Sequence, residues 1–228
     1  MCKILCYGGI KYMIGSVLFD MDGVLVDSEE LTYVAAIEML KERGADACRE
    51  DFRPFIGAGD IAYLGGAAGV HGLKYDKSMS DIAYQKYEKL VACRDIAYKN
   101  TVKTVLELKK AGIRLAVCTS SDLVKMNINL KAIGLADKFD ALINGRDIVN
   151  NKPAPDIYLK GAEMLGSDPS ECLVVEDAKN GILAAKAAGM HNVALTTTFS
   201  REELVSSVSP EFICDDIYDI IRIVKNSR

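Results

Sequence analysis

A short apolar run that ends in two carboxylates is the feature that most constrains the fold of this chain. Residues 17–19 are Val, Leu and Phe, a run typical of a buried parallel strand, and Asp20 and Asp22 follow it directly. Carboxylates left in a protein interior cost several kcal/mol each. We therefore expect both at the carboxyl end of the strand, where loops open to solvent and open α/β sheets place their sites. Gly23 would let the backbone turn sharply there.

A purely structural explanation exists for one of the two. Asp22 stands before a glycine, where Asp often serves only as a turn or helix-capping residue. The rest of the chain has to decide between that reading and a catalytic one.

The composition narrows the class of protein and of partner. The chain has 228 residues, of which 50% are hydrophobic and 26% charged, and its net charge is -4. Such a balance predicts no nucleic acid and no anionic membrane as the main partner. The seven cysteines show no Cys-x-x-Cys spacing, which favours free thiols in a reducing compartment. The apolar stretch 4–10 is short and interrupted by glycines, so we expect neither a secretory signal nor a membrane span. We expect residues 1–14 to be an extra leader ahead of the first strand, and no pattern in them indicates a role.

The order of the predicted elements indicates a two-part organisation. Residues 45–98 are helix-like without a convincing strand, whereas strands and helices alternate from residue 100 onward. This rhythm predicts an α/β protein with a Rossmann-like, doubly wound parallel sheet as its core, at residues 1–30 and 98–228. Residues 31–97 would form an inserted all-helical cap domain. The predicted strands after the first are 113–118, 141–143, 172–175, 192–195 and 212–214. The predicted helices are 29–43, one that is marked by Val102, Val105 and Leu106 and closed by Gly112, and those at 123–133, 156–165, 180–188 and 217–224.

Polar side chains stand where successive strands end. Thr119, Ser120 and Ser121 follow strand 113–118, Glu176 and Asp177 follow strand 172–175, and Lys152 follows the short strand 141–143. In a parallel sheet these ends meet at one edge. The sequence therefore predicts one cleft that holds several carboxylates, a group of hydroxyls and a lysine.

This set of groups has a chemical meaning. Carboxylates placed close together repel one another, and a hard divalent cation is the natural way to neutralise them. Oxygen ligands without paired Cys or His favour Mg²⁺ over zinc. The lysine and the hydroxyls suit the oxygens of a phosphate. Each residue alone could have an ordinary structural role, as a helix cap, a solvated loop lysine or an acid in the first turn of a helix. The occurrence of such polar groups at four strand ends together favours a site.

Four motifs carry a resemblance to a known family. They are Phe-Asp-Met-Asp-Gly-Val at 19–24, Thr-Ser-Ser at 119–121, Lys-Pro-Ala-Pro-Asp at 152–156 and Val-Glu-Asp-Ala-Lys-Asn-Gly at 175–181. With these motifs in this order, and with a helical segment between the first two, the chain resembles the haloacid dehalogenase-like superfamily. Within it, the chain is similar to the group of β-phosphoglucomutase and small-molecule phosphatases. The resemblance covers nearly everything from residue 15 onward.

The resemblance implies a role for each motif. Asp20 would be the nucleophile that forms an aspartyl-phosphate, and Asp22 the general acid and base. Thr119, Ser120 and Lys152 would bind the phosphoryl group. Asp20, Asp22 through its backbone carbonyl, Glu176 and Asp177 would hold Mg²⁺. The cap would close over the substrate and exclude bulk water.

Some positions depart from the pattern of that group. In β-phosphoglucomutase-like enzymes basic residues hold a second phosphate, whereas the aligned positions here are Asp60 and Asp122. Acidic residues at these places argue against such a mutase. Thr32 stands near the place of a histidine common in the family, so the positioning of Asp22 would differ in detail. Gly57, Gly59 and Asp60 are expected in a flexible cap loop that contributes to specificity.

We therefore expect a cytoplasmic, monomeric, Mg²⁺-dependent phosphatase of a small phosphorylated metabolite. One alternative is a sugar phosphomutase, and another is a binding or regulatory protein that keeps the fold without turnover. A receiver domain of phosphorelay signalling also combines an acidic pair, a hydroxyl and a lysine, but it needs neither an inserted cap nor the Asp-x-Asp spacing. No motif names the substrate.

Overall fold

A seven-stranded sheet forms the centre of the computed structural model, which describes residues 3–4, 13–55 and 59–227. The strand order is β1-β7-β6-β5-β2-β3-β4. Strands β2 to β7 run parallel, and the two-residue β1 pairs antiparallel with β7 at one edge. The strands are β1 (Lys3–Ile4), β2 (Ser16–Phe19), β3 (Arg114–Cys118), β4 (Ala141–Ile143), β5 (Cys172–Glu176), β6 (His191–Leu195) and β7 (Phe212–Cys214).

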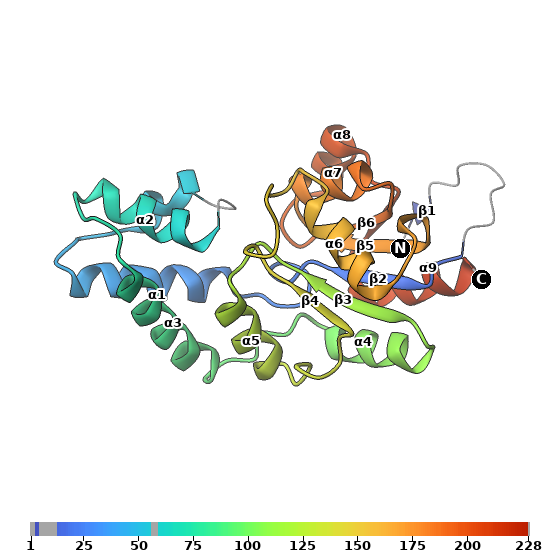
Figure 1. Ribbon diagram of the computed structural model, residues 1–228, viewed down its shortest axis with the longest axis horizontal. Coiled ribbons are helices and arrows are strands. Elements are labelled where there is room, and N and C mark those ends of the chain that lie inside the picture. The colour runs from blue at the N-terminus through green and yellow to red at the C-terminus, as the bar shows by residue number, and fades with distance from the viewer. Residues whose placement is uncertain (1–2, 5–12, 56–58, 228) are drawn as a thin grey trace.

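Helices cover both faces of this sheet, as the doubly wound prediction requires (Figure 1). The helices of the core are α4 (Thr101–Lys110), α5 (Leu123–Ala132), α6 (Asp156–Leu165), α7 (Lys179–Ala187), α8 (Arg201–Val208) and α9 (Ile220–Asn226), with short 3₁₀ turns η2 (Pro169–Glu171) and η3 (Ile217–Asp219). Helices α6, α7 and α8 lie on one face, and α4, α5 and α9 lie on the other.

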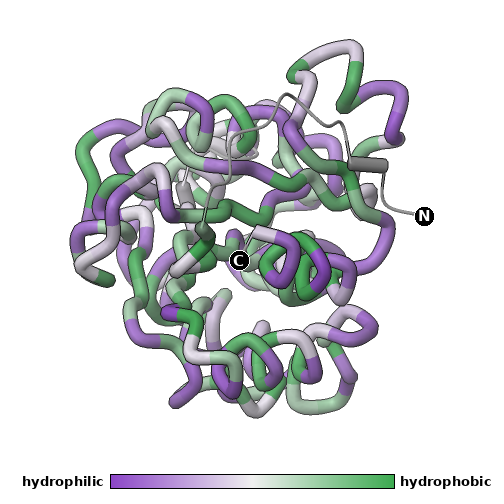
Figure 2. The backbone as a smooth tube through the Cα atoms, turned by 90° about the vertical axis from the view of Figure 1, so that its right-hand side faces the viewer, coloured by the Kyte–Doolittle hydropathy of each residue, from purple (hydrophilic) through white to green (hydrophobic). Residues whose placement is uncertain are grey.

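The buried strands explain why the sheet is covered on both sides. Successive side chains of a strand point to opposite faces, so Val17 and Phe19 of β2 pack with the cluster around α4, α5 and α9. Leu18 packs on the other face with Ile157 and Tyr158 of α6. All four residues of β2 are buried. In Figure 2 the hydrophobic colour gathers in the inner strands, while the outer helices alternate between hydrophobic and hydrophilic segments.

A block of helices lies beside the sheet, between β2 and α4 in the chain (Figure 1). It consists of α1 (Glu29–Glu42), η1 (Arg49–Phe55), α2 (Asp60–Val70) and α3 (Lys77–Val91), and its described residues include no named strand. The block has an apolar cluster of its own, in which the rings of Tyr33 and Phe52 meet edge to face at 5.9 Å. The predicted cap boundaries, 31–97, stay a prediction.

Helix α8 is missing from the elements predicted from the sequence. It begins with a capping box, in which Ser200 accepts a hydrogen bond from the Glu203 backbone while the Glu203 carboxylate accepts one from the Ser200 backbone. The Ser-x-x-Glu spacing is therefore a readable signal. The turn η1, which contains Pro54, lies within residues 45–98, the segment predicted to be helix-like. None of the described helices has the length and apolar character needed to cross a membrane.

Candidate active site

The site lies at the carboxyl end of β2, where the order of the strands reverses. Strands β3 and β4 lie on one side of β2, and β5, β6 and β7 lie on the other. Strand β2 pairs with β3 on one side and with β5 on the other, so that Phe19 stands opposite Val117 and Val175. Asp20 is the next residue, and its backbone N–H donates to the Val175 carbonyl at 3.0 Å. This is the edge at which doubly wound sheets bind their ligands.

Lys152 lies between two carboxylates of this edge. Its Nζ is 2.5 Å from Oδ1 of Asp20 and 2.7 Å from Oε1 of Glu176, and it also donates to the Cys118 carbonyl at 3.3 Å. The lysine side chain is only 9% exposed and that of Asp20 12%. Asp20 is therefore buried against Lys152, whereas the sequence had suggested a solvent-facing carboxylate. The loop that carries Lys152 covers the strand end, a contact across 132 positions of the chain.

Both oxygens of Glu176 already accept hydrogen bonds from the protein. Oε1 accepts from Lys152 and from the hydroxyl of Tyr158 at 2.8 Å, and Oε2 accepts from the backbone N–H groups of Asp177 and Ala178 at 2.9 Å each. A Cβ at Gly181 would collide with the Glu176 carboxylate, so this glycine leaves room for it. Glu176 thus accepts from four protein donors, one of which is Lys152.

Negative charge exceeds positive charge in this cluster. Among the described residues, Lys152 is the one cation that contacts Asp20 and Glu176. Burial raises the pKa of Asp20 to about 7, with a further contribution from Glu176, although Lys152 acts in the opposite direction. Burial, Glu176 and Asp20 also raise the pKa of Asp177 well above its ordinary value. Burial opposes the ammonium form of Lys152, but its two carboxylate partners prevail and raise its pKa well above the usual value.

Asp177 stands against the turn that follows Asp20. A Cβ at Gly23, whose φ is +83°, would collide with the Asp177 carboxylate. The hydroxyl of Thr198 donates to that carboxylate, and the hydroxyl of Thr197 donates to the Gly23 carbonyl at 2.6 Å. These two threonines follow the end of β6 and were missed in the sequence. The rule that found the other strand-end residues would have found them as well.

Asp22 accepts hydrogen bonds from three side chains. The hydroxyl of Ser28 and Nζ of Lys125, the latter at 3.0 Å, contact Oδ1, and the hydroxyl of Ser121 donates to Oδ2 at 2.8 Å. Burial would raise the pKa of Asp22, but Lys125 and the two hydroxyls outweigh it and hold the pKa below its ordinary value. Lys125 was not singled out in the sequence, because a lysine inside a helix carries no motif.

The three hydroxyl-bearing residues at the end of β3 differ in their surroundings. Thr119 is buried, and its Oγ1 accepts a hydrogen bond from the backbone of Ser121 at 3.1 Å. Ser120 and Ser121 line a cavity of about 320 Å³. The other lining residues are Gly59, Ile61, Ala62, Asp122, Gly145, Arg146 and Asn151. The cavity thus joins the start of α2 to the ends of β3 and β4, which is where a substrate would reach the phosphate-binding candidates.

Asp122 and Asp60 are the two acidic residues that argue against a mutase, and the structure describes the side chain of Asp122 but not that of Asp60. Asp122 caps α5 by accepting from the backbone of Val124 at 2.9 Å, and it forms an ion pair with Arg146. Its charge is therefore compensated, which weakens the argument drawn from it. Gly57 and the side chain of Asp60 lie outside the described residues, and Gly59 lines the cavity.

The donor set fits a magnesium ion in its chemistry. In the described part of the chain, no three His, Cys, Asp or Glu side chains gather closely enough to enclose an ion by themselves. Mg²⁺ does not need such an enclosure, because it keeps several waters and shares its other positions with phosphate. The close approach of the Asp177 carboxylate to Gly23 brings it beside the backbone of Asp22. Asp20, Asp177 and that backbone are oxygen donors in a cluster that carries excess negative charge.

Comparisons with known proteins identify the family of this chain. The haloacid dehalogenase-like hydrolase family matches residues 14–189. The chain is 41% identical to Protein SUPPRESSOR OF QUENCHING 1, chloroplastic, of Arabidopsis thaliana over 91% of its own length, but it spans only 20% of that longer protein. It is 29% identical to Pyrophosphatase PpaX of Bacillus velezensis, over 91% of this chain and 95% of that protein.

A solved structure gives the same result for the fold. CbbY from Rhodobacter sphaeroides in complex with phosphate superposes with a TM-score of 0.78 at 28% identity, over 91% of this chain and 96% of that one. The family match, the sheet order and the strand-end residues thus point the same way, and the resemblance seen in the motifs is confirmed. The chain belongs to the haloacid dehalogenase-like hydrolases, in the group that includes phosphatases.

Proposed function

We propose that this chain is a Mg²⁺-dependent phosphatase that hydrolyses a small phosphorylated metabolite through an aspartyl-phosphate. One observation carries the proposal: Asp20 lies at the carboxyl end of the central strand with Lys152 2.5 Å from its Oδ1, and Asp22 follows two residues later. A nucleophile, a phosphate-binding cation and a separate acid–base group are what in-line phosphoryl transfer requires of a protein.

The first half of the reaction forms the covalent intermediate. An oxygen of Asp20 attacks phosphorus, and the bond between phosphorus and the leaving oxygen breaks with its electron pair remaining on that oxygen. Asp22 donates a proton to the leaving oxygen. Because Lys125 and two hydroxyls hold the pKa of Asp22 below its ordinary value, this step draws on the small protonated fraction of its carboxyl group. Lys152, Thr119 and the backbone N–H of Ser120 hold the other phosphoryl oxygens and offset their charge.

The second half of the reaction releases phosphate. A water molecule attacks the phosphorus of the aspartyl-phosphate, and Asp22, now a carboxylate, takes its proton. The bond between phosphorus and the oxygen of Asp20 breaks, which restores the Asp20 carboxylate and yields inorganic phosphate. Glu176 keeps Lys152 in place through both steps, because Tyr158 and the backbone hold the Glu176 carboxylate itself in position.

Asp20, Asp177 and the backbone carbonyl of Asp22 would hold the magnesium ion. When bound, it would supply positive charge against the carboxylates and the incoming phosphate. Glu176 is the least suited of the four predicted ligands, since both its oxygens are engaged by protein donors. The raised pKa of Asp177 supports a role for this carboxylate beside a cation.

Residues 31–97 are proposed as a cap over this site. The cavity between Gly59 and Ser120 supports this assignment, since it offers a phosphate ester access to the strand ends from the side of α2. Closure of the helical block would exclude bulk water from the aspartyl-phosphate. The substrate class proposed here is a small phosphate ester, because a cavity of about 320 Å³ holds a metabolite and not a macromolecule.

A sugar phosphomutase is the second candidate. The ion pair between Arg146 and Asp122 favours keeping it, because Arg146 brings a cation to the wall of the cavity. A mutase would return the phosphoryl group from Asp20 to a second hydroxyl of the sugar instead of to water.

The test is phosphate release from sugar phosphates, phosphoglycolate, nucleotides and flavin mononucleotide, with Mg²⁺ and with a chelator. Asp20→Asn serves as the blank. Release that requires metal and vanishes in the blank would support the phosphatase. Interconversion of sugar monophosphates after addition of a bisphosphate, without release, would favour the mutase. Ligand-induced stabilisation without either reaction would favour a binding protein.

The monomeric state and the cytoplasmic location stay predictions. The relative from Arabidopsis thaliana is named as chloroplastic, so the cytoplasmic location needs a test of its own. Gel filtration and imaging of a tagged protein test the two predictions separately.

A further inference from the structure

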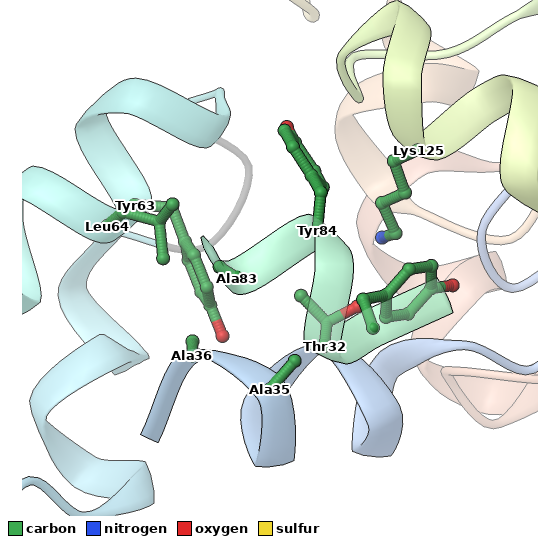
Figure 3. A pocket seen from close by; sticks show the side chains of 9 residues that line it. Thr32, Ala35, Ala36, Tyr63, Leu64, Ala83, Tyr84 and Lys125 are labelled. Carbon is green, nitrogen blue, oxygen red and sulfur yellow. The ribbon is translucent and has the colours of Figure 1, made fainter. Parts of the chain in front are cut away.

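Lys125 is a buried cation for which the proposed mechanism has no use. It lies on α5 in the core, its side chain is 8% exposed, and its Nζ is 3.0 Å from Oδ1 of Asp22. Figure 3 shows the side chain reaching from α5 toward Thr32 of α1, at the edge of a small pocket between the helical block and the core. A buried lysine is costly unless it is paired, so its place beside Asp22 needs a reason.

The two carboxylate oxygens of Asp22 have different hydrogen-bond donors. Oδ1 accepts from Ser28 and from Lys125, so both donors hold the same atom. Oδ2 accepts from Ser121, and Ser121 lines the cavity in which we place the substrate. A carboxylate oxygen offers about two acceptor positions. Oδ1 is thereby filled, whereas Oδ2 keeps one acceptor position beside its donor Ser121, a residue that lines the cavity.

Lys125 itself is held from the helical block. Its Nζ lies 5.7 Å from the centre of the Tyr87 ring of α3, within the range of a cation–π contact. The hydroxyl of Tyr87 donates to Asn129 of α5, one turn from Lys125, at 2.6 Å. The place of Lys125 thus depends on both α5 and α3.

We propose that Lys125 is a positioning residue for Asp22: by occupying Oδ1 together with Ser28, it turns Oδ2 toward the cavity as the atom that exchanges the proton. This inference rests on the proposed phosphatase reaction. In that reaction Oδ2 carries the proton that passes to the leaving oxygen, and it accepts the proton of water afterwards. Without Lys125, Oδ1 keeps Ser28 as its donor but loses the second, so the carboxyl group is held less firmly and the proton on Oδ2 is displaced.

A comparison of substrates with different leaving groups distinguishes this positioning role from a merely structural one. An alkyl oxygen is a poor leaving group and needs the proton of Asp22, whereas p-nitrophenolate leaves without one. Loss of the positioning residue should therefore reduce hydrolysis of an alkyl phosphate selectively. The quantity kcat/KM reports the steps up to formation of the aspartyl-phosphate, so the second half of the reaction does not enter the comparison.

The experiment measures kcat/KM of Lys125→Met for p-nitrophenyl phosphate and for the sugar phosphate that the wild type hydrolyses fastest. For the sugar phosphate we expect a loss on the order of 10²-fold, as for a small displacement of a catalytic group. For p-nitrophenyl phosphate we expect a value close to that of the wild type. Lys131→Met, at an exposed position of the same helix, is the matched control and should change neither value.

Asp22→Asn should show the same selective loss, and the double variant with Lys125→Met should be no worse, since both changes act through one group. Equal losses for the two esters, or no loss for either, would overturn the inference. If Lys125→Met does not fold by circular dichroism, Lys125→Gln is measured with the same expectation. A wild type that releases phosphate from no ester of the panel above would refute the proposed function, and that outcome is distinct from a wild type that is active with a Lys125 variant that shows no selectivity.

Discussion

The affinity for Mg²⁺ should fall steeply when the pH is lowered through 7. Binding of the ion at Asp20 requires the carboxylate form, and burial next to Glu176 raises the pKa of Asp20 to about 7. The sign follows from the direction of this shift. Below pH 7 the proton competes with the metal, whereas above pH 7 the carboxylate is already free. Asp177, whose pKa is also raised, acts in the same direction.

The magnitude follows from the pKa of about 7 for Asp20. With a pKa of about 7, the competition factor is about 11 at pH 6 and about 1.1 at pH 8. The Kd for Mg²⁺ should therefore rise about tenfold between pH 8 and pH 6 from Asp20 alone. About half a proton should be released from Asp20 for each ion bound at pH 7.

Isothermal titration calorimetry in buffers of different ionisation enthalpy measures both quantities. It suits this chain, which contains no tryptophan for a fluorescence assay. Asp20→Asn should bind Mg²⁺ more weakly and should lose the share of the pH dependence that Asp20 contributes. Asp46→Asn, at an exposed position outside the site, should behave as the wild type. An unchanged Kd at pH 6 and pH 8, or a pH dependence that Asp20→Asn leaves intact, would refute the reasoning.

Three further predictions concern the neighbours of the nucleophile. Lys152→Met should lower the free energy of unfolding by about 3–5 kcal/mol at pH 8, because two buried carboxylates lose their partner, and urea unfolding checks this. Gly181→Ala should destabilise by about 1–3 kcal/mol, because the added methyl group collides with the Glu176 carboxylate; Gly69→Ala in α2, where nothing lies nearby, is the control in the same assay. Arg146→Gln should raise KM on the order of tenfold for esters with a second anionic group and leave kcat unchanged in steady-state kinetics.

Local patterns in the sequence were sufficient for most of the fold. The apolar runs of β2 and β5 are buried on both faces, which only a sheet covered by two layers of helices can satisfy, and the structure has those layers. Strand β4 and helix α6 lie at the predicted bounds. The last helix was predicted as one element at 217–224, but it divides into η3 and α9. Helix ends are set by one or two hydrogen bonds, so they are the least determined feature of a pattern.

The strand-end rule also brought most of the site residues together without any coordinates. It worked for Asp20, Thr119 and Asp177 because parallel strands all end at the same edge of their sheet. Thr198, which follows the end of β6 and donates to Asp177, obeys the same rule. The chemistry that a strand end presents is thus a property of the sequence.

Contacts between distant side chains were decided by the tertiary structure alone. The pairing of Lys125 with Asp22 joins the middle of a helix to a loop, and the pairing of Arg146 with Asp122 compensates the acid and weakens the argument drawn from it. Each of these pairs depends on how α5 and the loop after β4 pack against the end of the sheet. A side chain's charge is written in the sequence, but its partner, and therefore its pKa and its role, is set by the packing that brings the two groups within about 3 Å.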